Sequence, residues 1–168
     1  MNFDTFWADI IATLIGGITL TFIFFLAKEK LFPLPNINGK WYLEVVTINT
    51  DYNPYKNMVL RYVIILRSEG NNIKGSAEKI YENSTTGERE YVGKDRTRAI
   101  IEGYIEKKYF SKDKLHMHSI ENGHQRESTN FYDLQVESNC FQVSKMTGTF
   151  NSMVANQDGT VAIQRKAF

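Results

Sequence analysis

The sequence of 168 residues has little cysteine, little proline and no excess of charge of either sign. Its one cysteine, Cys140, excludes a framework of intramolecular disulfides and fits a reducing compartment. The 20 basic residues nearly balance the 19 acidic ones, so the chain lacks the basic field typical of proteins that bind DNA or RNA. It also contains no P-loop, G-x-S-x-G or H-E-x-x-H motif. We therefore expect a protein that is not an enzyme, uses no cofactor and binds no DNA or RNA.

Long hydrophobic runs occur only near the N-terminus. Ile10–Ala27 contains no charged residue over 18 positions and, as a helix, would cover about 27 Å, close to the thickness of the bilayer hydrocarbon. Asp4 and Asp9 precede this run without any basic residue. A cleavable signal peptide needs a basic start and a small-residue cleavage site, and neither is present. The run therefore predicts a retained transmembrane helix.

The residues that flank and line this helix predict its orientation and its assembly. Lys28 and Lys30 follow the apolar run directly, which predicts a single-pass protein of the bacterial inner membrane with a periplasmic N-terminus and a cytoplasmic C-terminal part. Ala12, Gly16 and Gly17 place small residues on much the same stripe of the helix, which permits close approach of a second helix. We therefore expect membrane lipid as a partner, and homo-oligomers.

The remaining chain, residues 36–168, shows period-2 alternation of polar and apolar residues and no sustained helical periodicity. The alternation predicts eight strands, at residues 41–49, 57–67, 73–81, 98–107, 114–120, 127–136, 141–151 and 160–165. The polar stretch 83–94 is expected to be a long loop. Short turns between consecutive strands favour an up-and-down antiparallel β-barrel, because closure removes both sheet edges. An open two-sheet sandwich is the alternative.

Two residues near the ends of this meander support closure. Gly39 and Trp41 open the first strand with a Gly-x-Trp pattern, and Arg165 lies in the last strand. First and last strands are neighbours in a closed meander, so the Arg165 guanidinium can stack on the Trp41 indole. This arrangement resembles the lipocalin-type barrel and implies a structural role for Trp41 and Arg165, which would plug one barrel end. We predict a mainly β protein with a membrane anchor (1–30), a proline-containing connector (31–35) and a lipocalin-like cytosolic barrel (36–168).

Several strands carry amphipathic side chains suited to a ligand that contains phosphates and bases. Arg61 is the first candidate for a phosphate partner, and Tyr62, Tyr104, Tyr132 and His118 are candidates for stacking or rim contacts. Arg61 and Tyr62 are adjacent on a strand, so only one of them can face the interior, and a one-residue shift of register inverts the choice. If Arg61 faces outward, it is an ordinary solvated residue.

Other polar residues give weaker indications. His116 and His118 share one strand face, a spacing that can bind a metal, and His124 follows in the next turn. No cysteine or carboxylate spacing completes this set, so no metal site is expected. Cys140 has no activating neighbour in the sequence and is expected to be a packed residue. The basic residues within 94–98 form a cluster that would attract phosphates or simply remain solvated.

The layout of a membrane anchor followed by a meander that opens with Asn36-Ile-Asn-Gly-Lys-Trp41 resembles a known family. This family contains the two-transmembrane-plus-β-strand effectors of bacterial cyclic-oligonucleotide anti-phage signalling (CBASS). Further shared patterns are Ile73-Lys-Gly75, Gly148-Thr-Phe150 and Asp158-Gly-Thr160. The chain departs from the family in showing one membrane helix where the family has two.

The resemblance implies an antiviral defence function. In that family the barrel senses a cyclic di- or oligonucleotide made by a partner nucleotidyltransferase, and assembly in the membrane then disrupts it and causes cell death or arrest. The residues alone leave two other functions open. One is a membrane-anchored lipocalin-like carrier or sensor of a small apolar ligand, and the other is a structural barrel that docks a partner. An apolar ligand predicts an apolar interior, whereas a nucleotide predicts Arg, Lys and Tyr side chains that point inward.

Overall fold

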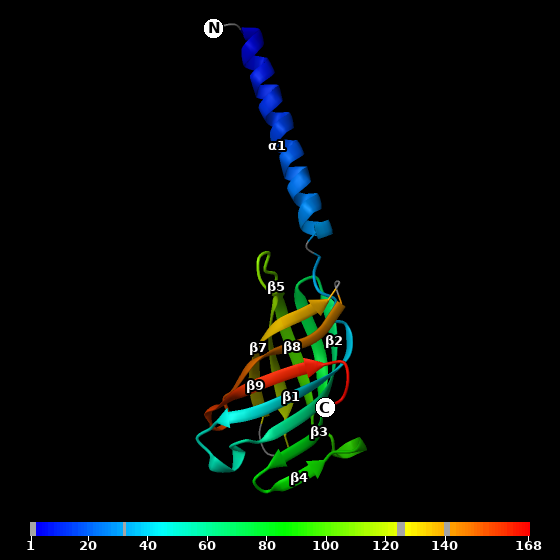
Figure 1. Cartoon of the computed structure of the whole chain (residues 1–168), viewed down its shortest axis with the longest axis vertical. Helices are drawn as coiled ribbons and strands as arrows, with labels where there is room; N and C mark the ends of the chain where they lie inside the picture. Colours follow the sequence, from blue (N-terminus) through cyan, green and yellow to red (C-terminus); the bar gives the residue numbers. More distant parts are fainter. Residues whose placement is uncertain (1–2, 32, 124–126, 140–141) are drawn as a thin grey trace. The chain divides into compact units, whose positions relative to one another are not determined.

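The structure, a computed structural model, describes residues 3–31, 33–123, 127–139 and 142–168 (Figure 1). The chain divides into two compact units, Met1–Pro33 and Leu34–Phe168. The first unit contains helix α1 (Phe3–Leu31), in which Phe6–Lys28 is long and apolar enough to cross a membrane and has no residue buried within the chain. A helix that is apolar all round has no polar face to present to water. The fold therefore provides one helix suited to a membrane.

Two threonines in α1 are bonded within their own helix. The Thr13 hydroxyl donates to the Asp9 carbonyl at 2.8 Å, and the Thr21 hydroxyl donates to the Gly17 carbonyl at 2.8 Å. These hydroxyl donors are thus engaged locally, so close approach of a second helix would depend on the small residues. A Cβ placed on Gly16 or Gly17 would meet nothing within 4 Å outside the backbone of its own helix.

Within the described residues, the second unit is an antiparallel sheet of nine strands (Figure 1). The strands are β1 (Gly39–Asn49), β2 (Val59–Glu69), β3 (Asn72–Ser84), β4 (Gly87–Glu90), β5 (Arg98–Glu106), β6 (Lys114–Asn122), β7 (Glu127–Asn139), β8 (Gln142–Ser152) and β9 (Gln157–Gln164). β1 pairs with β9 on one side and with β2 on the other, and β2 pairs with β3. This last pairing closes eight strands into a barrel and leaves β4 outside the ring, paired with the end of β3.

The closed eight-stranded barrel confirms the prediction from the sequence, and the sandwich alternative is wrong. Three local predictions are corrected. Residues 83–94 are not simply a loop, because β3 continues to Ser84 and turns through Gly87 (φ 124°) into β4. The last strand begins at Gln157 rather than at Thr160, because Ala155 and Asn156 turn the chain earlier, in the left-handed region at φ 54° and 50°. The sixth strand, β6, extends beyond Ile120 to Asn122.

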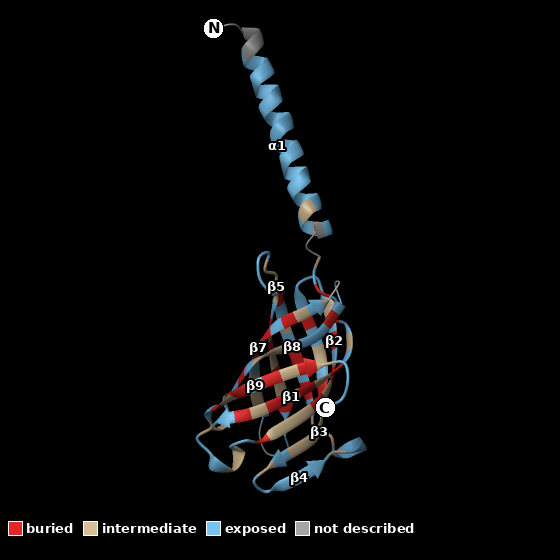
Figure 2. Cartoon of the chain, viewed as in Figure 1, coloured by how far each residue is buried: buried red, intermediate tan, exposed pale blue. Residues whose placement is uncertain are grey.

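Burial alternates along the strands, as expected for a barrel with one face toward the core (Figure 2). In β1, Trp41, Leu43 and Val45 are buried while the residues between them are partly exposed. Two glycines permit the close approach of strands where the wall bends. A Cβ on Gly148 would overlap the Asp133 carbonyl of β7, and a Cβ on Gly159 would overlap the Val46 carbonyl of β1.

One end of the barrel is closed by Trp41 and Arg165. Trp41 is fully buried and donates its indole N–H to the Ile37 carbonyl at 2.7 Å. The Arg165 guanidinium carbon lies 3.5 Å from the centre of the Trp41 ring. Its two terminal nitrogens donate to the carbonyls of Lys40 and Asn38 at 3.0 and 2.9 Å. The stacking expected from the sequence is therefore present, and it ties the last strand to the start of the first.

Replacing Arg165 by alanine should lower the free energy of unfolding by about 1–3 kcal/mol, because it removes a cation–π contact and two hydrogen bonds. Arg165→Lys keeps the charge but loses the planar fork, so it should give an intermediate loss. Urea unfolding of the full chain in detergent, followed by near-ultraviolet circular dichroism, measures both variants. An unchanged midpoint for Arg165→Ala would contradict the structural role of the stack.

Candidate functional site

A buried ion pair lies inside the barrel at the end opposite Trp41. The Lys79 ammonium of β3 lies 3.1 Å from a carboxylate oxygen of Glu121 on β6, and both side chains are largely buried. The Tyr62 hydroxyl of β2 donates to the other oxygen of Glu121 at 3.0 Å. Glu82 adds a second carboxylate at 3.6 Å from Lys79 and accepts a hydrogen bond from the Tyr91 hydroxyl at 3.1 Å. Three strands and the segment that follows β4 therefore meet in one polar network.

A second group of polar side chains borders this network. The hydroxyls of Ser119 and Tyr132 are hydrogen-bonded at 3.1 Å. The Thr47 hydroxyl donates to the Gln157 side-chain oxygen at 3.1 Å, and the Gln157 amide donates to the Val154 carbonyl at 2.9 Å. Within the part of the chain that the structure describes, every buried side-chain nitrogen and oxygen has a hydrogen-bond partner. The interior network is thus satisfied without a ligand.

The pKa values of these interior groups follow from burial and from Glu121. Burial raises the pKa of Tyr132 to about 12, and burial together with the Glu121 carboxylate raises that of Tyr62 well above its ordinary value. Burial acts to lower the pKa of Lys79, but the charge and hydrogen bond of Glu121 outweigh it and leave the pKa raised. Both tyrosines are therefore neutral and Lys79 is cationic at neutral pH.

The network lines a cavity of about 200 Å³ at this end of the barrel. The titratable groups that line it include one cation, Lys79, and two carboxylates, Glu82 and Glu121. Ligand sites for drug-sized molecules are typically about 300–1,000 Å³, and several phosphates need an excess of cations. This cavity is too small and too acidic for a ligand with two or more phosphates.

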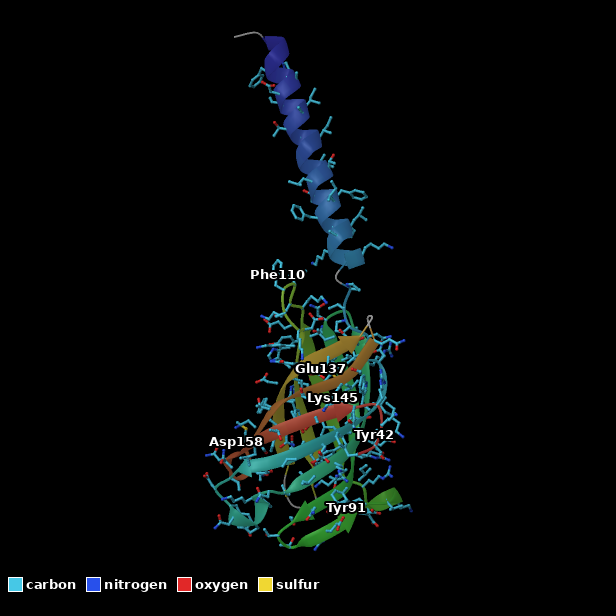
Figure 3. All side chains as sticks on the ribbon, viewed as in Figure 1. Tyr42, Tyr91, Phe110, Glu137, Lys145 and Asp158 are labelled. Atoms are coloured by element: carbon cyan, nitrogen blue, oxygen red, sulfur yellow. The ribbon has the colours of Figure 1, made fainter. Side chains whose placement is uncertain are left out.

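A second hollow, of about 400 Å³, lies on the outer face of the barrel beside the segment that follows β4. We call it the outer groove. It has a different chemistry, because three cations and four aromatic rings converge on it. Its charged and aromatic lining consists of Lys40, Tyr42, Arg61, Tyr81, Glu90, Tyr91, Arg96 and Phe168. Tyr42 and Tyr91, labelled in Figure 3, mark two of its walls.

Arg61 is held at the centre of the aromatic lining. Its guanidinium carbon lies 4.7 Å from the centre of the Tyr81 ring and 6.0 Å from that of Phe168. Its Nε is 2.7 Å from a carboxylate oxygen of Glu44, and no described residue is hydrogen-bonded to its two terminal nitrogens. A phosphate could therefore accept from these two nitrogens while Glu44 keeps the side chain in place.

The other two cations of the outer groove come from opposite sides. The Lys40 ammonium lies 5.0 Å from the centre of the Tyr42 ring, on β1. Arg96 donates to the Tyr91 carbonyl at 3.2 Å and pairs with Glu78 at 3.2 Å. Because these contacts fix Arg96 beside Tyr91, a ligand in the groove would meet cations and aromatic faces together.

The structure separates the five residues predicted to bind a ligand. Tyr62 and Tyr132 point into the barrel and are buried. Arg61, Tyr104 and His118 lie on the outer face, so of the two alternatives that the sequence left open, Tyr62 is the inward residue and Arg61 the outward one. The buried cation is instead Lys79, two residues before the outward Tyr81, across a bulge in the pairing of β2 with β3.

Sequence reasoning missed Lys79 and Glu121. The predicted strand 114–120 ended one residue before Glu121, yet Glu121 continues the inward series of Leu115, Met117 and Ser119 along β6. That period-2 series was a signal that could have placed it inside. Lys79 had the same kind of signal, because it continues the inward series of Ile73, Gly75 and Ala77 along β3, and the bulge comes only after it.

The predicted histidine pair faces outward as well. His116 stacks on Tyr104, with 5.0 Å between ring centres, and contacts Asp133 and Glu106. His118 lies 6.2 Å from Phe131. No group of three possible metal ligands occurs among the described residues. His124 and Cys140 lie outside the residues that the structure describes.

Comparisons of the chain with protein-family models, with curated proteins and with solved structures each gave no match.

The raised pKa values predict that the barrel loses stability at alkaline pH. Between pH 10 and about 12 the unfolded chain ionises Tyr132 while the folded chain keeps it neutral. Because the unfolded chain has lost this tyrosine proton and the folded chain has kept it, the free energy of unfolding falls by about 1.4 kcal/mol per pH unit over this range. Tyr132→Phe should therefore reduce the loss between pH 10 and 12, as measured by urea unfolding at several pH values. Tyr104→Phe, on the outer face, is the matched control, and an equal effect of both variants would contradict the interior assignment.

Proposed function

We propose that the protein is a membrane-anchored effector of bacterial anti-phage defence, in which the barrel binds a cyclic oligonucleotide messenger. A partner nucleotidyltransferase would make this messenger. Helix α1 would span the inner membrane with the barrel in the cytoplasm, and assembly of several copies would disrupt the membrane and cause cell death or arrest. The observation that carries the proposal is the outer groove on a barrel that is joined to an apolar helix.

The chemistry of the outer groove matches a ligand of this class. Phosphates need cations with free donors, which Arg61 and Lys40 supply, and bases need flat aromatic faces, which Tyr42, Tyr81 and Tyr91 supply. Both features lie within one hollow of about 400 Å³ on the outer face of the barrel, so the bases of a larger ring could extend beyond it. The interior cavity offers neither the volume nor the charge.

Helix α1 supports the second half of the proposal. It is apolar on every side, and a Cβ on Gly16 would meet nothing within 4 Å outside its own backbone. Ala12 lies one turn before Gly16 on the same stripe, so two helices could approach closely there. Binding that brings barrels together would then bring helices together in the membrane.

Arg61→Ala should weaken binding of a cyclic oligonucleotide roughly tenfold to 100-fold, because a charge-assisted hydrogen bond is worth about 1.5–3 kcal/mol. The full chain in detergent is titrated with a panel of cyclic di- and trinucleotides by calorimetry. The affinity of the wild type should fall as salt rises, since cations and phosphates are partly exposed.

Arg67→Ala is the matched control, because Arg67 is on the same strand face but is mostly exposed and outside the outer groove. This variant should bind as the wild type does. Equal losses in both variants would show a general charge effect rather than a site. Binding of an apolar probe such as a fatty acid, with no cyclic oligonucleotide bound, would favour the lipocalin-like carrier instead.

The double substitution Gly16→Leu and Gly17→Leu should reduce chemical cross-linking between copies in membranes, because the leucine side chains hold the helix backbones apart. Barrel folding should be unchanged, since α1 belongs to a separate unit. The pair Leu14→Ile and Ile18→Leu, on the opposite helix face, is the matched control. Cross-linking that persists in the glycine variant would remove this stripe from the proposal.

A further inference from the structure

We propose that the loop between β5 and β6, residues 107–113, is a second membrane-contacting element that inserts its tip into the headgroup region of an anionic lipid bilayer. The inference rests on α1 being in a membrane, but it does not depend on any ligand in the outer groove. It concerns a surface of the barrel itself.

The base of this loop is fixed by Asp113. One carboxylate oxygen of Asp113 accepts the Lys108 backbone N–H at 2.9 Å, and the other pairs with the Lys107 ammonium at 2.8 Å. The Asp113 carbonyl accepts the Val136 N–H at 2.8 Å, and Lys112 pairs with Glu137 at 3.0 Å. The ends of the loop are therefore anchored to the wall of the barrel, so its tip has a defined position.

The tip presents aromatic side chains to solvent. Phe110 is fully exposed and points away from the strands (Figure 3). Tyr109 beside it is 45% exposed. A single exposed phenylalanine is common on soluble surfaces, but here two exposed aromatic residues are adjacent at the tip of an anchored loop. Phenylalanine gains from leaving water, and tyrosine is typical of the membrane–water interface.

The charge around the tip suits anionic lipid. Residues 106–114 carry four lysines against two carboxylates. Lys112 and Lys108 flank the aromatic tip and are partly exposed, and they pair with Glu137 and Glu106. Because an ammonium group has three donors, each lysine can also meet a lipid phosphate while the rings enter the headgroup layer.

The position of the loop in the barrel also favours a lipid partner. Asn36, near the start of the barrel unit, forms a β-bridge with Gln142 at the start of β8. The start of β8 pairs with the end of β7, and Val136 near that end of β7 donates its N–H to the Asp113 carbonyl. The loop and the entry of the chain therefore lie at the same barrel end. From Lys28, the last residue of the apolar span, to Leu34 is six residues, which reach at most about 20 Å. The length of the connector therefore limits how far this barrel end can be from a membrane that holds α1.

The test places an environment-sensitive fluorophore on Ser111→Cys in the full chain, with Cys140→Ser as background. The protein is reconstituted into phosphatidylcholine vesicles with and without phosphatidylglycerol, and brominated lipids serve as quenchers. We expect a blue-shifted emission and quenching several-fold greater than at Met153→Cys, an exposed position in the turn at the opposite barrel end. Adding Phe110→Ser to the Ser111→Cys variant should remove most of this quenching.

Each outcome decides a separate part of the inference. Water-like emission at both positions, in protein that resists carbonate extraction, would overturn the loop contact while leaving the membrane anchor intact. Equal quenching with and without phosphatidylglycerol would overturn the assignment of anionic lipid. Failure of the protein to remain in the membrane would instead contradict the proposed anchoring by α1.

Discussion

The hydrogen-bonded pairing of β2 with β3 holds the barrel closed. It closes the sheet and thereby decides, residue by residue, which side of the wall each β2 and β3 side chain occupies. Tyr62 enters the core and Arg61 is left outside as a consequence. Lys79 follows the regular inward alternation of β3, and the bulge after it turns Tyr81 outward, opposite Arg61. If the pairing were shifted by one residue, the side chains that now face the interior would face outward and those that now face outward would enter the interior.

The two faces of this wall have different physical roles. Inside, Lys79 and Glu121 are buried together, which is tolerable only because each neutralises the other and Tyr62 supplies a further hydrogen bond. The network is complete by itself and specifies how β2, β3 and β6 meet. Outside, Arg61 stacks between aromatic rings with its terminal nitrogens unpaired by any described residue. The outer face is therefore the one with donors left for a ligand.

Alternation of residue type was sufficient to predict the barrel, because half-buried strands repeat every two residues. It could not choose between Arg61 and Tyr62, since both are long and amphipathic and only the register with neighbouring strands decides. Lys79 and Glu121 were missed because a charged residue is normally exposed, and their burial depends on a contact 42 residues apart in sequence. β4 was missed because residues 83–94 carry no hydrophobic alternation to reveal a strand outside the core.

We propose that the outer groove, rather than the barrel interior, takes a cyclic oligonucleotide. Hydrogen–deuterium exchange of the full chain, with and without a panel of such nucleotides, distinguishes the two places. We expect slower exchange in β4 and in the following residues 91–96 on binding, with no change in the turn 153–156 beside the interior cavity. Protection confined to that turn and to β6, with β4 unchanged, would contradict it.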